Sequence, residues 1–379
     1  MDFDVMVVGL GVHGAATLRA LSQRGKRVLG LDRFDVPHTN GSSHGESRII
    51  RQAYHEHPSY VPFVQRAYTL WDELARETKQ ELMLRTGGLF LGKPDSRIVR
   101  GALESARLHG LPHETLTPKQ VAERYPMFRL QKDEIAVAEP RAAVLRVPET
   151  HLALLESAKK SGAAIRTGED VRSWSADAKT VTVTTAKEKY VAQSLVIAAG
   201  AWLGRLVPQL ASSLRVERQA VGWFRPRREA AAFRPDRFPI FLWDRTPRDE
   251  IVYGFPDLGA GVKVGIHHAG ETVDPDTVSR VATTVDADRL RKQVVAGFPQ
   301  LDGDPVATGV CLYTNTPDEA FILDHHPKHK NVVIASCCSG HGYKFAPAVG
   351  EAAADLALGT PTKADLALFR IARFGPEPW

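Results

Sequence analysis

The chain opens with an apolar run of strand length, Phe3 to Val8, followed directly by a G-x-G-x-x-G turn at residues 9–14. Apolar residues then recur at helical spacing from Ala15 to Leu21. A second apolar run, Val28 to Leu31, ends at Asp32. Strand, glycine turn, helix, strand and acid thus follow one another within about 30 residues, and this order predicts a dinucleotide-binding βαβ unit.

Each residue of this unit has a physical role. Gly9 permits the tight exit from the strand, Gly11 lets the backbone touch a pyrophosphate, and Gly14 lets helix and strand pack closely. The helix N-terminus offers free N–H groups and a partial positive charge to phosphates. Asp32 is expected to accept hydrogen bonds from an adenosine ribose. The fingerprint alone does not separate FAD from NAD.

The rest of the chain mixes helical and strand patterns. An amphipathic helix is predicted over Val61–Glu77, with Val64, Ala67, Trp71 and Leu74 on one face. Further helices are expected at 102–109, 118–125, 150–160 and 346–358, and strands at 89–91, 171–174, 181–183, 195–202, 251–255, 261–265 and 332–335. Residues 33–48 form a long polar loop rich in Gly and Ser, and such loops are usually functional. Strand-rich and α/β stretches interleave, which predicts two domains that share the chain discontinuously.

Composition narrows the class of protein. The 379 residues are 43% apolar and 25% charged, which is ordinary for a soluble globular protein. Asp2 and Asp4 stand where a signal peptide carries basic residues, and the apolar runs are too short for a membrane span, so we expect a cytoplasmic protein. The net charge of +5 is spread along the chain, and we expect no nucleic-acid partner.

The cysteines argue against disulfides and against metal. There are three, Cys311, Cys337 and Cys338, and two of them are adjacent. Their odd number disfavours a disulfide framework, and no Cys or His spacing suggests a metal site. We therefore expect free thiols and no metal centre.

Several motifs occur in the order known from one enzyme family. They are the opening turn, the loop of residues 37–51, Ala199–Trp202, Tyr253–Pro256, Lys263 with His267, Cys311–Tyr313 and Ser339–Phe345. With these motifs the chain resembles monomeric sarcosine oxidase and N-methyltryptophan oxidase, which are flavin amine oxidases of the D-amino-acid-oxidase-like fold. The resemblance covers nearly the whole chain.

The resemblance implies an α/β fold in two parts. A Rossmann-like FAD-binding domain would comprise residues 1–85, 146–216 and 317–379. An interleaved α+β substrate domain, built on a large mixed or antiparallel sheet, would comprise 86–145 and 217–316. The implied cofactor is FAD, the implied partners are a small amino-acid substrate and O2, and the implied state is a monomer. The implied reaction oxidises a secondary, N-methyl or cyclic, amino acid to an imine, reduces O2 to H2O2 and ends with imine hydrolysis.

The family's catalytic and substrate-binding roles are carried over residue by residue. Lys263 matches the lysine that activates oxygen, where a buried cation stabilises superoxide; a surface lysine on a strand is the structural alternative. Arg51 and Lys344 match the pair that binds the substrate carboxylate. Arg48, one helical turn before Arg51, matches an arginine near the flavin. The remaining matched pocket residues are His44, Tyr253, His267 and Tyr313.

The family's cofactor contacts map onto a second set of residues. Cys311 matches the cysteine that forms a thioether to the flavin; a buried structural cysteine is the alternative. The other expected cofactor contacts are Gly9, Gly11, Gly14, Asp32, Ser42, Gly200, Trp202, Gly340 and Gly342. The chain departs from the family pattern at Ser43, Glu46 and Ser47, and at Cys337-Cys338, where sarcosine oxidases tend to have Gly-Phe.

Two other functions are compatible with the motifs. One is a flavin dehydrogenase that oxidises an amino acid or hydroxy acid and passes the electrons to a carrier rather than to O2; the match at Lys263 argues against it. The other is a non-catalytic flavoprotein module. Arg51 and Lys344 argue against this module, because a scaffold has no use for a carboxylate-binding pair.

Overall fold

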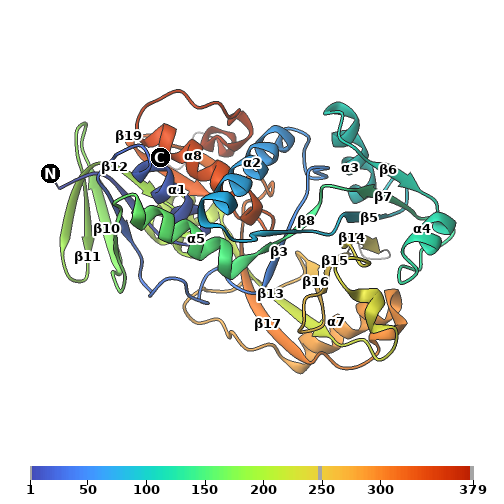
Figure 1. The fold of residues 1–379 in the computed structure, drawn as a ribbon. Coiled ribbons are helices and arrows are strands. Elements are labelled where there is room, and N and C mark those ends of the chain that lie inside the picture. Colours follow the sequence, from blue (N-terminus) through green and yellow to red (C-terminus); the bar gives the residue numbers. More distant parts are fainter. Residues whose placement is uncertain (1, 246–249, 376–379) are drawn as a thin grey trace.

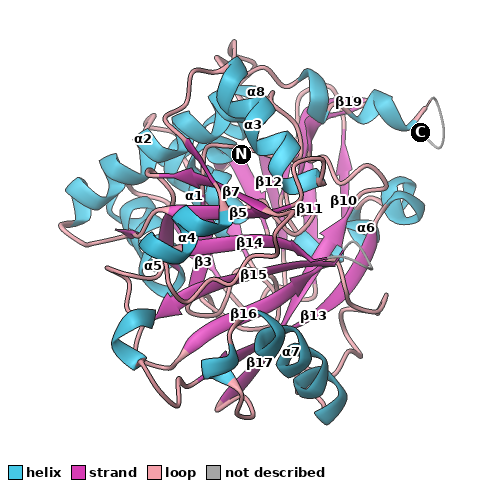
Figure 2. Ribbon diagram, turned by 90° about the vertical axis from the view of Figure 1, so that its right-hand side faces the viewer, coloured by secondary structure: helices cyan, strands magenta, loops and turns pink. Residues whose placement is uncertain are grey.

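The computed structural model of the chain describes residues 2–245 and 250–375. Within these residues the strands form three sheets, and helices cover them (Figures 1 and 2). The helices are α1 (Val12–Ser22), α2 (Tyr60–Thr78), α3 (Arg97–Leu108), α4 (Pro118–Arg124), α5 (Val147–Lys160), α6 (Leu203–Leu206), α7 (Thr284–Gly297) and α8 (Ala346–Ala357).

The first sheet contains the predicted dinucleotide unit. Its strands are β1 (Phe3–Val8), β2 (Val28–Leu31), β9 (Ala164–Arg166), β10 (Val171–Ala176), β11 (Val181–Thr185), β12 (Lys189–Ile197), β18 (Ile322–His326) and β19 (His329–Ser336). Strands β19, β12, β1, β2 and β9 are parallel in that spatial order. The turn at residues 9–14 joins β1 to α1, and Asp32 follows β2 directly, as predicted.

The second sheet is mostly antiparallel. Its order is β17 (Ala307–Asn315), β13 (Arg215–Phe224), β16 (Val262–His267), β15 (Glu250–Asp257), β14 (Ile240–Arg245), β5 (Gly88–Gly92), β7 (Ile135–Glu139) and β6 (Glu114–Leu116). Only the pair β14 and β5 is parallel among its described strands. Figure 1 shows this sheet to the right of the first one, with α3, α4 and α7 around it. The predicted mixed sheet is therefore confirmed.

Strand alternation sorts the second sheet into a core face and a site face. On β16, Val262, Val264 and Ile266 are buried in the aromatic core. Lys263, Gly265 and His267 point the other way, because successive side chains of a strand leave on opposite faces. The cross-strand register places further predicted site residues, on β15 and β17, on the same face.

A short third sheet corrects one expectation. It pairs β3 (Ser47–Ile50) with β8 (Ala143–Arg146), and β8 with β4 (Met83–Arg85). The prediction that Arg48 and Arg51 are separated by one helical turn was wrong. Arg48 lies on β3, and Arg51 follows directly after that strand, because pairing with β8 extends this segment of backbone.

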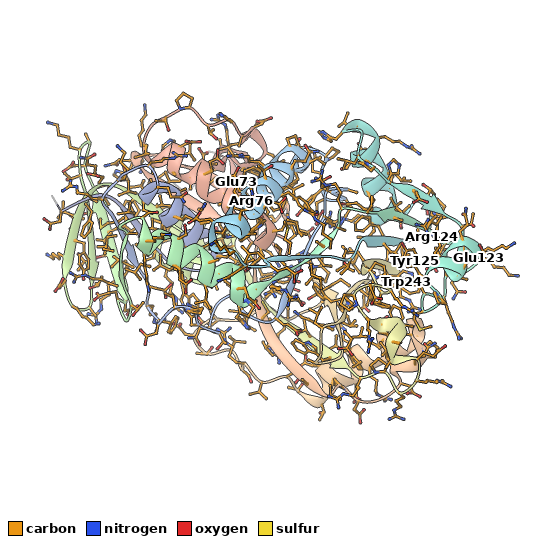
Figure 3. All side chains as sticks on the ribbon, in the orientation of Figure 1. Glu73, Arg76, Glu123, Arg124, Tyr125 and Trp243 are labelled. Carbon is orange, nitrogen blue, oxygen red and sulfur yellow. The ribbon has the colours of Figure 1, made fainter. Side chains whose placement is uncertain are left out.

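The helical predictions agree closely with the structure. In α2 the predicted apolar face, Val64, Ala67, Trp71 and Leu74, is buried, whereas Glu73 and Arg76 lie on its polar side (Figure 3). The strand expected at 195–202 ends earlier, at Ile197, and a 3-10 turn covers 200–202. The strands of both large sheets come from interleaved stretches of chain; the proposed domain ranges themselves stay a prediction. No helix among the described residues is both long enough and apolar enough to span a membrane.

Close packing of helices supports the glycine turn. Helix α1 packs against α8 and α5. At Gly350 on α8, a Cβ atom would lie 2.4 Å from the carbonyl carbon of Ala16 on α1. The two backbones therefore touch, and this contact fixes the helix whose N-terminus faces the cofactor region.

We expect Gly350→Ala to destabilise the protein by about 2 kcal/mol, because overpacking outweighs the gain of about 1 kcal/mol in helix propensity. Chemical denaturation measures the change. The matched control is Gly297→Ala in α7, where the nearest obstacle is the flexible end of Arg245 at 2.6 Å. Equal effects of the two substitutions, or a stabilised Gly350→Ala protein, would contradict this account of the packing.

Candidate functional site

A cavity lies between the carboxyl ends of the parallel strands and the site face of the second sheet. Nearly all residues predicted for the site line it: Gly9, Gly11, Asp32, Ser42, His44, Arg48, Arg51, Gly200, Trp202, Tyr253, Lys263, His267, Cys311, Tyr313, Gly340, Gly342 and Lys344. Gly14 lies behind the turn, where a Cβ at its position would come within 1.8 Å of the Gly9 carbonyl oxygen. The structure thus brings the predicted residues together, while their individual roles remain predictions.

One end of the cavity has the geometry of a dinucleotide site. Gly9 has φ +88°, and a Cβ there would lie 2.5 Å from the carbonyl oxygen of Ala198. The N-cap residue of helix α1 is Gly11, which has no side chain to cap the helix. The Val12 N–H instead donates to Ser43 Oγ at 2.9 Å. The Asp32 carboxylate accepts from the N–H groups of Leu10 and Phe34, at 2.7 and 2.9 Å. These bonds fix the carboxylate at the edge of the cavity.

These residues fit FAD. Gly9 and Gly14 keep the turn compact where any larger residue would clash with the backbone. Asp32 occupies the position at which the fingerprint binds a ribose. Further along, His44 Nε2 is buried without a hydrogen-bond partner among the described residues, as expected for an atom that faces a missing polar group. If bound there, FAD would be held by the turn at residues 9–14, by Asp32 and by the loop around Ser42.

The middle of the cavity holds Arg48 and Cys311. The Arg48 guanidinium donates to the carbonyl oxygens of Ser47 and Ser42, both at 2.9 Å, and lies 3.4 Å from Cys311 Sγ. Cys311 is a free thiol on β17. Cys311 also lines the cavity, so its sulfur can reach a bound group. The arrangement is therefore compatible with attachment of a cofactor to Cys311.

Lys263 is buried, so the alternative of a surface lysine is wrong. Its ammonium group donates to the carbonyl oxygen and to Oγ of Ser47, at 3.1 and 3.2 Å. Burial, with the charge of Arg48, lowers the pKa of Lys263 to about 7. Lys263 therefore changes its charge near neutral pH.

At the far end, Arg51 already has an acidic partner. Its Nη2 donates to both oxygens of Glu56 at 2.7 Å, and its Nη1 donates to the Ala53 carbonyl oxygen at 3.0 Å. Burial alone would raise the pKa of Glu56, but the Arg51 charge outweighs it and holds that pKa well below its usual value. A substrate carboxylate therefore competes with Glu56 for the Nη2 side of Arg51.

Lys344 is the second cation at this end. Its ammonium donates to the His341 carbonyl oxygen at 2.5 Å and to the Tyr54 hydroxyl at 3.4 Å. Burial and the nearby Arg51 lower the pKa of Lys344 to about 7. A lysine ammonium has three N–H donors, so one can still serve a ligand.

His267 and Tyr313 lie side by side in the wall of the cavity. His267 Nδ1 lies 3.3 Å from the Tyr313 hydroxyl. Gly340, with φ +75°, lets the neighbouring loop approach, since a Cβ there would lie 2.7 Å from His267 and 2.6 Å from Tyr313. Burial, with the adjacent His268, lowers the pKa of His267 well below its usual value, so the ring is neutral at pH 7.

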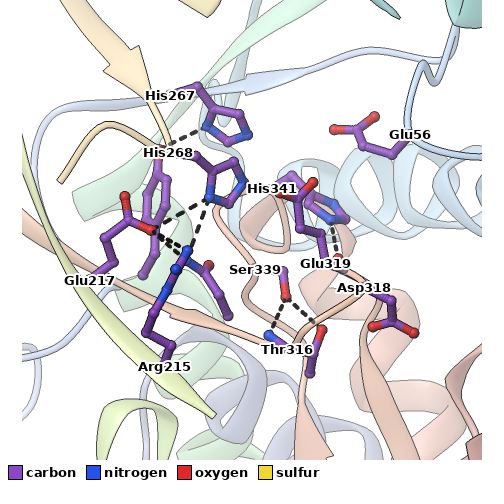
Figure 4. Close-up of polar contacts among 12 residues, drawn as sticks. Glu56, Arg215, Glu217, His267, His268, Thr316, Asp318, Glu319, Ser339 and His341 are labelled. Atoms are coloured by element: carbon purple, nitrogen blue, oxygen red, sulfur yellow. Dashed lines mark hydrogen bonds and ion pairs between the residues drawn. The ribbon is translucent and has the colours of Figure 1, made fainter. Parts of the chain in front are cut away.

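A polar network connects this wall to neighbouring strands and loops (Figure 4). His268 lies between two carboxylates, 3.7 Å from Glu217 and 3.8 Å from Glu319. The Glu319 carbonyl oxygen lies 3.0 Å from Nε2 of His341, whose other nitrogen is 2.6 Å from the Tyr54 hydroxyl. The network links β13, β16 and the loop before β18 to the residues around Lys344.

Charged side chains of both signs line the dinucleotide end, where Arg33 and Arg205 accompany three acids. Asp32, Glu169 and Asp170 line the dinucleotide end, where ribose hydroxyls need acceptors. Cationic side chains line the other end, namely Arg48, Arg51, Lys263 and Lys344, with Glu56 as the nearby acid. The potential at that end therefore favours an anionic ligand.

Sequence reasoning missed residues that contact the predicted cations of this site. Glu56 pairs with Arg51, Tyr54 contacts Lys344, and Trp223 lies against Lys263. Glu56 and Tyr54 lie in an irregular segment without periodicity, so no sequence pattern indicated either contact. Trp223 shares the site face of the second sheet, and a correct strand register would have found it.

Comparisons with known proteins agree with this geometry. The model of the family described as FAD dependent oxidoreductase matches residues 4–356. Monomeric sarcosine oxidase of Streptomyces avermitilis is 39% identical over 380 residues, covering 99% of each chain. N-methyl-L-tryptophan oxidase of Salmonella heidelberg is 34% identical, covering 99% of this chain and 100% of the relative.

Solved structures confirm the fold. The open form of NikD, described as an unusual amino acid oxidase essential for nikkomycin biosynthesis, is 26% identical with a TM-score of 0.85 and covers 97% of each chain. L-proline dehydrogenase from P. horikoshii, at 22% identity, has a TM-score of 0.84 and covers 98% of each chain. The chain therefore belongs to the FAD-dependent oxidoreductase family and, within it, to the group of the sarcosine and N-methyltryptophan oxidases.

Proposed function

We propose that this FAD-dependent amine oxidoreductase oxidises a secondary amino acid, either N-methylated or cyclic, to an imine and reduces O2 to H2O2. The observation that carries the proposal is the cluster of buried cations at the end of the cavity remote from the dinucleotide turn. An amino-acid carboxylate matches that potential. The named activities of the sarcosine and N-methyltryptophan oxidases agree with it.

The protein's own residues bind and orient the substrate in this proposal. Lys344 and Arg51 hold the carboxylate through charge-assisted hydrogen bonds, which fixes the position of the amine. The surrounding positive charge and the low hydration of the cavity favour the neutral, reactive form of the amine. Bound FAD supplies a two-electron acceptor that O2 can reoxidise. Water then hydrolyses the imine, giving formaldehyde and the demethylated amino acid from an N-methyl substrate.

Lys263 has a separate role in the proposal. It places an ammonium group in a dry part of the cavity, where a positive charge stabilises the anion formed when O2 accepts an electron. The finer features of the proposal are a covalent bond from Cys311 to the flavin, a monomeric state and a cytoplasmic location.

A substrate panel tests the function, with Lys344→Gln as the diagnostic variant. We expect peroxide release with one of sarcosine, N-methyltryptophan, proline or pipecolate. In Lys344→Gln, KM should rise about 30- to 160-fold, since a charge-assisted hydrogen bond contributes about 2–3 kcal/mol. The apparent KM of the unmodified enzyme should also rise as the pH passes upward through about 7, because Lys344 then loses its charge.

Lys330→Gln removes an exposed lysine and serves as the control. Anaerobic bleaching of the flavin without peroxide release in air would instead support a dehydrogenase. No bleaching with any of the four amines would contradict the proposal.

Glu56→Gln tests whether Arg51 binds the carboxylate. If Glu56 competes for Arg51, the variant should bind a non-oxidisable carboxylate such as propionate about tenfold more tightly, because the neutral amide holds a guanidinium less strongly. Flavin absorbance reports the titration. Unchanged affinity, together with a lowered unfolding temperature, would show that the pair is structural.

Acid precipitation tests the covalent bond. The precipitated protein should be yellow, whereas Cys311→Ser should release its flavin into the supernatant, because an alcohol cannot form the thioether. Cys338→Ser is the control, since this second cysteine also lines the cavity. A colourless pellet from the unmodified protein would rule out attachment.

A further inference from the structure

We propose that Trp223 and Glu46 are positioning residues that hold the Lys263 ammonium group in its charged form and in its place. This inference rests on the role of Lys263 in the proposed function. It adds two residues to which the family motifs assign no role in the reaction.

The sheet register places Trp223 directly against Lys263. The two residues are cross-strand partners on β13 and β16, so their side chains leave the sheet on the same face. The Lys263 Nζ lies 5.3 Å from the centre of the Trp223 ring and 4.9 Å from the centre of the Phe255 ring. Both distances are within the range of cation–π attraction, and tryptophan is the strongest aromatic partner.

Glu46 fixes the indole that makes this contact. Its Oε2 accepts the Trp223 indole N–H at 2.9 Å. The Glu46 carbonyl oxygen in turn accepts the Val147 N–H at 3.1 Å, which anchors the loop at the start of α5. The carboxylate of Glu46 also lies close enough to Lys263 to favour its charged form. Glu46 therefore acts on Lys263 twice, through the ring and through its charge.

The surroundings of Lys263 both oppose and favour its positive charge. Burial and the guanidinium of Arg48 disfavour a second cation, whereas Cys311 and Glu46 favour it. His44 lies on the adjoining loop, and burial with the charge of Arg48 lowers its pKa to about 4, so it adds no charge at pH 7. Ser47 supplies two neutral acceptors. The rings of Trp223 and Phe255 thus attract an ammonium group that contacts no carboxylate among the described residues.

The sign of the expected effect follows directly. Removing an attraction for the ammonium lowers the pKa of Lys263, so its charge is lost at a lower pH. The rate at which O2 reoxidises the reduced flavin should then fall over a lower pH range. Lys263→Met sets the reference, because this variant should lose the pH-dependent component and reoxidise at least about 100-fold more slowly if the charge contributes some 3 kcal/mol.

The experiment compares Lys263→Met and four further variants of the holoenzyme with the unmodified protein by stopped-flow reoxidation from pH 5.5 to 9. We expect the midpoint of the pH profile to fall by about one unit in Trp223→Leu, equivalent to about 1.4 kcal/mol. Glu46→Ala should lower it nearly as much, because the indole is released. Glu46→Gln should lower it less, since the amide oxygen still accepts the indole N–H.

The fourth variant, Trp174→Phe, is the matched control. Trp174 lies on β10 of the first sheet, and its indole donates to the Leu206 carbonyl oxygen of α6 at 2.7 Å. The midpoint of this variant should not move. The same midpoints are read without turnover from the pH dependence of the visible absorbance of the oxidised flavin. If Trp223→Leu fails to fold, the two Glu46 variants carry the comparison.

The outcomes separate this inference from the proposed function. An unchanged reoxidation rate in Lys263→Met would overturn the role of Lys263 itself. A slow Lys263→Met enzyme together with unshifted midpoints in Trp223→Leu and Glu46→Ala would overturn only the positioning role. Equal shifts in Glu46→Ala and Glu46→Gln would overturn the anchoring of the ring and leave a charge effect alone.

Discussion

The structure depends on keeping several cations out of water around one cavity. Arg51, Lys263 and Lys344 are nearly inaccessible to solvent, and Arg48 lies between them and the dinucleotide turn. Burying an ammonium or guanidinium group is costly unless hydrogen bonds and opposite charges offset the loss of hydration. The chain meets this cost with backbone carbonyls, aromatic faces and one tightly held carboxylate. The buried cations create a positive electrostatic potential in this part of the cavity.

The two large sheets supply complementary parts of this site. The parallel sheet presents the N-terminus of α1 and a row of acids at its carboxyl edge, as open α/β sheets do. The other sheet presents one face of alternating polar and aromatic residues, whose opposite face is packed into an aromatic core. Rigid strands fix these side chains more precisely than loops would, and this precision suits a reaction between three bound partners.

The sequence predicted the individual elements and the residues of the cavity, but it did not predict which side chains contact one another. The glycine turn, Asp32 and the apolar face of α2 follow from spacing that is visible along the chain, and the resemblance to the family located the residues of the cavity. The helical spacing assumed for Arg48 and Arg51 was wrong, because a cross-strand partner nearly 100 residues away, on β8, sets that backbone. The contacts of Glu56 with Arg51 and of Glu46 with Trp223 also depend on tertiary structure, and no local pattern encodes them.

The carboxylate seated on Arg51 has a consequence for which molecules can occupy the cavity. A ligand that displaces Glu56 from Nη2 of this guanidinium exchanges one anion for another, so the net charge around Arg51 is the same before and after. Small inorganic anions gain nothing from such an exchange, because they offer no further contacts to offset the release of a tethered group. An acid that also fills the apolar and aromatic walls gains such contacts, so Glu56 would act as an internal competitor that selects ligands by shape rather than by charge.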